Sequence, residues 1–131
     1  MSGGKISGNK AGSGGGVYIQ YNGTFTMLGG EISGNTAFDT TSYDADSYGG
    51  GGVYVRHYIY GGVEDGIFRI VSGTVYGSEA DTDLRNTALN GATLAGNGTA
   101  QRGVLSGSTF LPYGNLATTD TTIKVLNGYV K

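Results

Sequence analysis

A seven-residue string that occurs twice constrains the fold of this chain more than any other feature. Residues 3–9 read GGKISGN and residues 29–35 read GGEISGN, so the two strings differ only at Lys5 and Glu31. Two nearly identical strings imply one structural position that is filled twice. This is typical of proteins built by stacking similar units.

Three further matches extend the repeat along the chain. GGGVYI at 14–19 returns as GGGVYV at 50–55, GTFTMLGGEI at 23–32 is echoed by GIFRIVSGTV at 66–75, and TTIKVLNGYV at 121–130 fits the same ten-residue template. The last match places Ile123 over Phe25 and Val130 over Ile32. Four passes through one template are therefore expected, with connections of unequal length leaving as surface loops.

The repeated segments alternate apolar and polar residues, as half-buried strands do. Thr26 separates Phe25 from Met27, and Arg69 separates Phe68 from Ile70. Because no window places apolar residues at helical spacing, we expect an all-β fold of stacked parallel strands. We expect a single domain over residues 1–131, with coils at approximately 3–22, 23–65, 66–120 and a partial 121–131. Low-complexity disorder is the alternative interpretation of the 27 glycines, but it does not require repeated apolar positions.

Composition narrows the classes of partner. The net charge of −2 and the scattered basic residues argue against binding to nucleic acid. No apolar run approaches the ~20 residues of a membrane-spanning helix, so no membrane insertion is expected. The chain has no cysteine, which excludes disulfides and thiolate metal sites.

The segments GGxISGNxA, GGGVYV and GTFTMxGG resemble the repeats of right-handed parallel β-helix surface proteins of bacteria, which share the pectate-lyase-like architecture. The end of the chain, from SGTVYGSEA at Ser72 to TTIKVLNGYVK, resembles the closing module of repetitive surface proteins of spirochaete-type bacteria. The resemblance covers most of the chain outside expected loops at 38–48, 57–65 and 103–115. It implies a right-handed parallel β-helix (β-solenoid) of about three to four coils with long loop insertions, in an adhesin-like protein that is extracellular or on the bacterial cell surface.

Stacking in register predicts two side-chain ladders. Asn9 and Asn35 follow the same ISG string and would exchange amide hydrogen bonds along the stack, ending where Ser78 occupies the third position. Tyr18 and Tyr54 would stack on the outer face, with Ala95 as their third-pass counterpart. The two tyrosines either cover neighbouring strands or form a platform for carbohydrate.

Two groups of residues suggest chemistry. Asp39, Asp44 and Asp46 carry the oxygen ligands that calcium prefers, although the loop lacks EF-hand spacing and also reads as a solvated polar loop. Arg56 and His57 offer the basic residues of a polysaccharide lyase, but no carboxylate is placed opposite them, and a solvated strand end is the simpler interpretation. We therefore expect no enzyme activity and no cofactor other than calcium.

These features predict a non-catalytic extracellular structural or adhesive protein. Unpaired strands at the two ends of the stack would join copies end to end as a homo-oligomer or filament, with TTIKVLNGYVK and GGKISGN meeting as consecutive strands. One alternative is a carbohydrate-binding surface module with a glycan or host-surface ligand. The other is a polysaccharide lyase-like enzyme.

Overall fold

The described part of this computed structural model comprises residues 1–38, 49–57, 64–88 and 91–131. It contains strands and turns but no helix, so the all-β prediction is confirmed within these ranges. The strands are β1 Lys5–Ser7, β2 Lys10–Ala11, β3 Val17–Ile19, β4 Thr24–Met27, β5 Glu31–Ser33, β6 Thr36–Ala37, β7 Val53–Val55, β8 Ile67–Ile70, β9 Gly73–Val75, β10 Thr87–Ala88, β11 Leu94–Ala95, β12 Thr99–Ser106, β13 Thr109–Asn115, β14 Ile123–Leu126 and β15 Tyr129–Val130.

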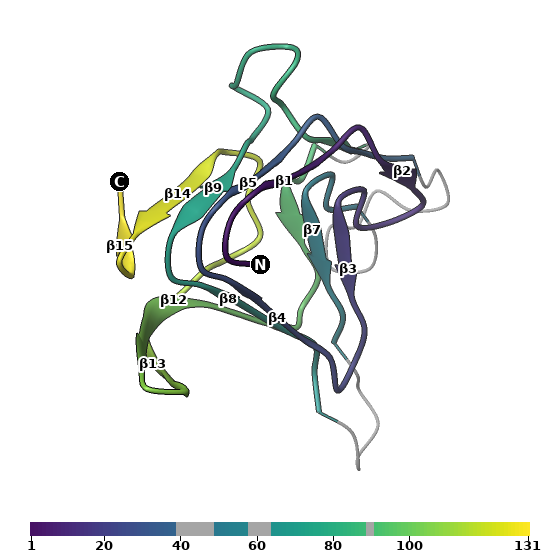
Figure 1. Cartoon of the computed structure of the whole chain (residues 1–131). Coiled ribbons are helices and arrows are strands. Elements are labelled where there is room, and N and C mark those ends of the chain that lie inside the picture. Colours follow the sequence, from purple (N-terminus) through teal and green to yellow (C-terminus); the bar gives the residue numbers. More distant parts are fainter. Residues whose placement is uncertain (39–48, 58–63, 89–90) are drawn as a thin grey trace.

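Three successive passes of the chain lie on one another. Each pass contributes one strand to each of four small sheets: sheet A (β1-β5-β9-β14-β15), sheet B (β2-β6-β10), sheet C (β3-β7-β11) and sheet D (β4-β8-β12-β13). Figure 1 looks along the stack, so that β4, β8 and β12 lie side by side below the amino terminus and β3 and β7 lie side by side to its right. Each strand is too short to be stable alone, and the neighbouring passes complete its backbone hydrogen bonds.

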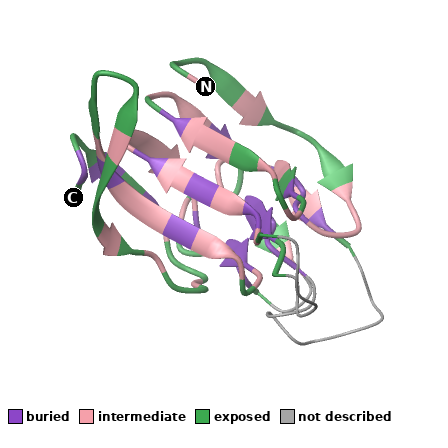
Figure 2. Ribbon diagram, turned by 90° about the horizontal axis from the view of Figure 1, so that it is seen from below, coloured by how far each residue is buried: buried purple, intermediate pink, exposed green. Residues whose placement is uncertain are grey.

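The register within these passes follows the sequence repeats. Ile6 pairs with Ile32, Phe25 pairs with Phe68, and Val17 pairs with Val53, all in parallel. Val75 pairs in turn with Ile32, as the match between residues 23–32 and 66–75 predicts. The paired apolar residues build one core between the sheets, and Figure 2 shows the most buried positions on the central strands.

The glycine runs before β3 and β7 let two backbones lie in contact. A Cβ added to Gly15 would lie 2.6 Å from the carbonyl oxygen of Gly51, and one added to Gly51 would overlap the carbonyl oxygen of Thr87. Hydrogen bonds join the same segments, including Gly16 N to Gly51 O at 3.2 Å. A side chain at either position would separate the passes.

The prediction of a single right-handed parallel β-helix of three to four coils is wrong. The described strands form four separate small sheets, and two of these sheets combine parallel with antiparallel pairs. After its parallel pairing with β8, β12 continues into an antiparallel hairpin with β13, and β14 runs antiparallel to both β9 and β15.

The expected fourth pass over residues 121–130 is this antiparallel β14–β15 hairpin. The turn explains the reversal between β14 and β15, because Asn127 and Gly128 both have positive φ (49° and 83°), the geometry of a two-residue hairpin turn. β14 itself enters antiparallel to β9, so Ile123 pairs with Val75 rather than lying over Phe25, and after the turn Val130 pairs with Val125 rather than lying over Ile32.

Candidate functional site

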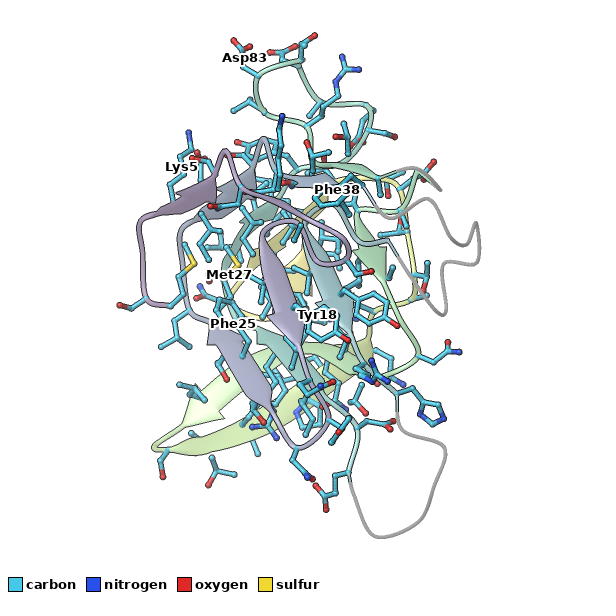
Figure 3. All side chains as sticks on the ribbon, turned by 90° about the vertical axis from the view of Figure 1, so that its right-hand side faces the viewer. Lys5, Tyr18, Phe25, Met27, Phe38 and Asp83 are labelled. Atoms are coloured by element: carbon cyan, nitrogen blue, oxygen red, sulfur yellow. The ribbon has the colours of Figure 1, made fainter. Side chains whose placement is uncertain are left out.

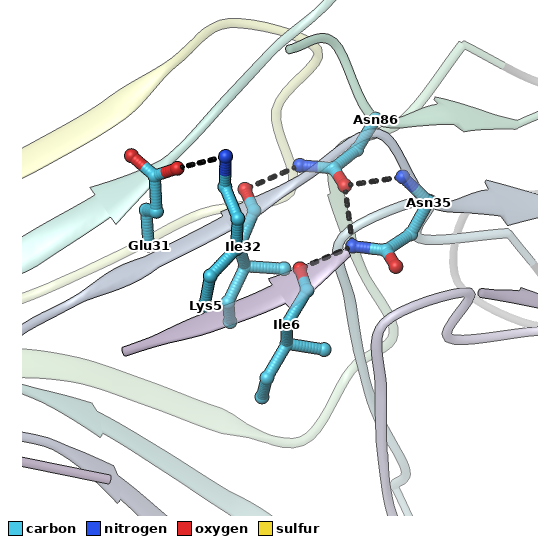
Figure 4. Close-up of polar contacts among 6 residues, drawn as sticks. All are labelled: Lys5, Ile6, Glu31, Ile32, Asn35 and Asn86. Carbon is cyan, nitrogen blue, oxygen red and sulfur yellow. Dashed lines mark hydrogen bonds and ion pairs between the residues drawn. The ribbon is translucent and has the colours of Figure 1, made fainter. Parts of the chain in front are cut away.

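Three asparagines form a ladder across the stack. Asn35 Oδ1 accepts hydrogen bonds from Asn9 N and Asn9 Nδ2 at 3.0 and 3.1 Å. Asn86 Oδ1 accepts the equivalent pair from Asn35 N and Nδ2 at 3.0 and 2.9 Å, and Figure 4 shows both bonds to Asn86. The side-chain amide of Asn35 also donates to the backbone oxygen of Ile6 in the preceding pass, and that of Asn86 donates to the backbone oxygen of Ile32. Asn35 and Asn86 are fully buried, so the ladder satisfies polar groups inside the core.

The prediction that Ser78 ends this ladder is wrong. Ser78 lies in a loop that leaves the stack after β9, and its backbone N–H donates to Asp120 O at 2.7 Å. The chain returns at Asn86, where the string NTA at 86–88 repeats NTA at 35–37 and places Thr87 opposite Thr36. This shorter repeat is the signal that identifies the third asparagine.

The two residues that distinguish the GGxISGN copies pair with each other. Lys5 Nζ lies 2.6 Å from Glu31 Oε1, at directly paired positions of β1 and β5 (Figure 4). The hydrogen bond and the negative charge of Glu31 raise the pKa of Lys5 above its ordinary value. The Lys5 side chain remains half exposed at the edge of sheet A.

Tyr18 and Tyr54 stack on the outer face of sheet C. Their ring centroids lie 5.1 Å apart with 20° between the ring planes, and Figure 3 shows Tyr18 on the side of β3 that faces the viewer. Ala95 occupies the third position of the series, opposite Tyr54. Tyr18 is 42% exposed but Tyr54 only 4%, because Tyr54 packs with Ala92 and Ala95. The pair therefore presents one ring, not two, to a ligand.

Arg56 and His57 directly follow β7, the strand that carries Tyr54. Arg56 Nη1 donates to Tyr18 Oη at 2.9 Å, and the guanidinium lies 5.8 Å from the ring centroid of Tyr21. The hydrogen bond to Tyr18 raises the pKa of Arg56, so the arginine stays charged. We call Tyr18, Tyr21 and Arg56 the tyrosine–arginine corner.

His57 has a carboxylate partner that the sequence analysis did not find. His57 Nδ1 lies 2.8 Å from Asp65 Oδ1, and both side chains are partly exposed. The two residues are eight positions apart, on either side of residues 58–63, and no repeat marks the pairing. An aspartate hydrogen-bonded to a histidine fixes the orientation of the ring, and such a contact occurs in structural pairs as well as beside catalytic bases.

A second surface is formed by the two carboxyl-terminal hairpins, which lie together beside the carboxyl terminus in Figure 1. The rings of Tyr113 on β13 and Tyr129 on β15 lie 5.2 Å apart, and Arg102 Nη1 donates to Gly128 O at 2.8 Å, so the hairpins are joined. We call the exposed apolar residues of the two hairpins the hairpin surface, which comprises Leu105, Leu111, Tyr113, Leu126, Tyr129 and Val130.

An open pocket with a volume of about 390 Å³ adjoins this surface between β9 and β14. Leu126, Val125 and Gly73 contribute to its walls, and Lys124 and Lys131 bring positive charge. The repeats do not predict the hairpin surface, because residues 103–115 lie outside them and are expected to form a loop. The available signals are the Asn-Gly turn at 127–128 and the glycine turn at Gly107, which has a φ of 63°.

The predicted calcium ligands Asp39, Asp44 and Asp46 lie outside the described residues. Within the described ranges, no group of three or more His, Asp or Glu side chains is placed to hold a metal ion. The same ranges contain no helix with the length and apolar character needed to cross a bilayer.

Comparisons of the chain with protein-family models, with curated proteins and with solved structures find no match.

Proposed function

We propose that this chain is a non-catalytic structural and adhesive protein that associates with a second copy of itself through the hairpin surface. The observation that supports this proposal is the location of the exposed apolar residues. Nine large apolar side chains of the described residues are exposed, and six of them belong to the hairpin surface. Exposed apolar residues concentrated on two joined hairpins favour an interaction site there, whereas singly scattered ones do not.

A second copy suits this surface for two physical reasons. β15 ends sheet A and β13 ends sheet D, so both strands carry backbone groups that a neighbouring strand can pair. Antiparallel pairing of one edge with the same edge of another copy is compatible with two-fold symmetry, which requires a self-complementary patch. The net charge of −2 gives little repulsion between copies.

Analytical ultracentrifugation over a wide concentration range tests this proposal. We expect a reversible dimer in which Tyr129→Ser, 60% exposed in the wild type, weakens association at least about tenfold, since burying an aromatic ring contributes about 1.5–3 kcal/mol. Tyr18→Ser is the matched control, because Tyr18 is exposed on another sheet and its loss should leave association unchanged. A monomer at all concentrations, or equal losses in the two variants, would contradict the proposal.

The same experiment separates a dimer from the filament that the sequence analysis predicts. An end-to-end filament gives an open series of species, whereas association through one patch stops at two copies. In this structure the last strand, Tyr129–Val130, pairs back onto β14, so it does not continue directly into another copy's β1. The resemblance of the repeats would place such a protein outside the cytoplasm, at a bacterial surface.

The tyrosine–arginine corner supports a second candidate function, the binding of an acidic glycan. An exposed tyrosine ring stacks against sugar rings, and a guanidinium binds a sugar carboxylate or sulfate through paired hydrogen bonds. A glycan array tests it: we expect Tyr18→Ala and Arg56→Gln each to lower the signal for acidic glycans. Phe38→Ala is the control, since Phe38 is another exposed aromatic residue. Depolymerisation of any glycan on the array would instead favour the lyase alternative and would be checked with His57→Ala.

A further inference from the structure

The geometry points to a binding site for an extended peptide segment along the outer edge of β1 and β2, with a preference for the pattern Gly-Gly-Glu-Ile-Ser-Gly-Asn. The first-pass strands β1 to β4 are each the last strand of their sheet. Every second N–H and C=O of such a strand points away from its neighbour, which allows a further strand to add in parallel.

The asparagine ladder specifies which residue would lie over Asn9. At both of its steps, an asparagine carboxamide oxygen accepts from the backbone N–H and from the Nδ2 of the asparagine one pass earlier. Asn9 Oδ1 is the equivalent acceptor at the outer end, and among the described residues it has no partner. The geometry of the ladder therefore fits one more asparagine, four residues after the position that lies over Lys5.

The ion pair specifies the residue over Lys5. Lys5 and Glu31 are directly paired across β1 and β5, with Lys5 Nζ 2.6 Å from Glu31 Oε1. A glutamate on an added strand would give alternating charges at this position, whereas a lysine would place two positive charges opposite each other. Of the chain's two copies of the motif, the glutamate form is therefore the favoured ligand.

The glycines at the start of β1 leave room for this strand. A Cβ added to Gly29 would lie 2.9 Å from Ser2 O, because the earlier pass runs against it. A Cβ added to the equivalent Gly3 meets no atom within 4 Å, and the φ of Gly3 is not in the left-handed region. Nothing in the described structure requires glycine at this position, but a neighbouring backbone at the spacing seen beside Gly29 would require it.

The ligand is an unfolded or flexible segment rather than the folded core of a second copy. Within the folded chain the glutamate form of the motif is β5, which is paired on both sides by β1 and β9. A segment of another polypeptide that carries the pattern has its backbone groups free, and adds to the edge as peptides do in β-augmentation.

NMR titration of the ¹⁵N-labelled chain with blocked nine-residue peptides tests this site. The probes are GGEISGNTA, GGKISGNTA and GGEISGATA. We expect GGEISGNTA to shift amide signals of Lys5 to Ala11, GGKISGNTA to bind about three- to tenfold more weakly, and the peptide without asparagine to bind about tenfold more weakly. Added salt should reduce the preference for glutamate over lysine.

A charge-swapped chain gives the decisive control. Lys5→Glu combined with Glu31→Lys keeps an ion pair between β1 and β5 but reverses the charge at the edge. We expect the swapped chain, shown to be folded by its dispersed amide spectrum, to prefer GGKISGNTA. If the swapped chain does not fold, the salt dependence of the wild-type preference decides. Absence of shifts at millimolar peptide, shifts centred away from β1 and β2, or a preference that does not follow the charge of residue 5 would overturn the proposal.

Discussion

Replacing Asn35 by alanine tests whether the asparagine ladder holds the passes together. The Asn35 side chain makes four hydrogen bonds, two from Asn9 and one each to Ile6 O and Asn86 Oδ1. At a net contribution of about 0.5–1.5 kcal/mol each, their loss amounts to roughly 2–6 kcal/mol. Asn9 is exposed, so its freed donors can bind water, and we place the cost at about 3 kcal/mol.

Urea denaturation followed by circular dichroism measures this cost. A loss of about 3 kcal/mol lowers the urea midpoint by roughly 1–2 M at an unchanged slope, and lowers the melting temperature by roughly 10 °C. Asn9→Ala is the control: it removes one ladder bond and a local bond to Ser7 O, both at the exposed end, and should cost less than about 1 kcal/mol. Equal costs for the two variants, or a cost below about 1 kcal/mol for Asn35→Ala, would refute the reasoning.

Two further predictions concern the contacts between segments. Glu79 Oε1 accepts a hydrogen bond from Thr122 N at 2.7 Å, and hydrogen bonding to Thr122 lowers the pKa of Glu79. The stability that this carboxylate contributes is present above its ordinary pKa of 4.5 and is lost as the pH falls through the lowered value. The urea midpoint of the wild type should therefore fall more between pH 6 and pH 3 than that of Glu79→Gln. Parallel pH curves for the two proteins would argue against this contribution. Gly51→Ala should lower the free energy of unfolding, measured by urea denaturation, by about 3 kcal/mol or more, because the added Cβ overlaps Thr87 O. Gly3→Ala should leave it unchanged, since no atom lies within 4 Å of its added Cβ. Similar urea midpoints for the two variants would show that neighbouring passes can move apart at little cost.

The sequence predicts the stacked part of this fold well because identical strings must occupy identical surroundings. The parallel register of Ile6 with Ile32, and of Phe25 with Phe68, follows directly from laying one string on the other. Apolar alternation then assigns the inward face, since these residues contribute to the core. Repetition carries no information about where a repeat ends, so the fourth template match predicts another parallel pass where the structure has an antiparallel hairpin.

The misassigned segments are those in which a turn overrides the strand pattern. TTIKVLNGYV has the same apolar spacing as the true repeats, but its Asn-Gly pair adopts two positive φ angles and reverses the chain. The loop between β9 and β10 similarly moved the third ladder position from Ser78 to Asn86. Pairs that form between segments outside the repeats, such as His57 with Asp65 and Tyr113 with Tyr129, have no periodic signal.

The reversed hairpins give the molecule two chemically different ends. On the β14 side, sheet A passes from parallel to antiparallel pairing at β9, so another motif of the GGxISGN type has no equivalent edge to extend there. On the β1 side, an added copy of the motif could pair in parallel with β1 as β1 pairs with β5. Designed variants with more repeats should therefore tolerate added units only ahead of β1, with the two hairpins kept as a fixed closing piece.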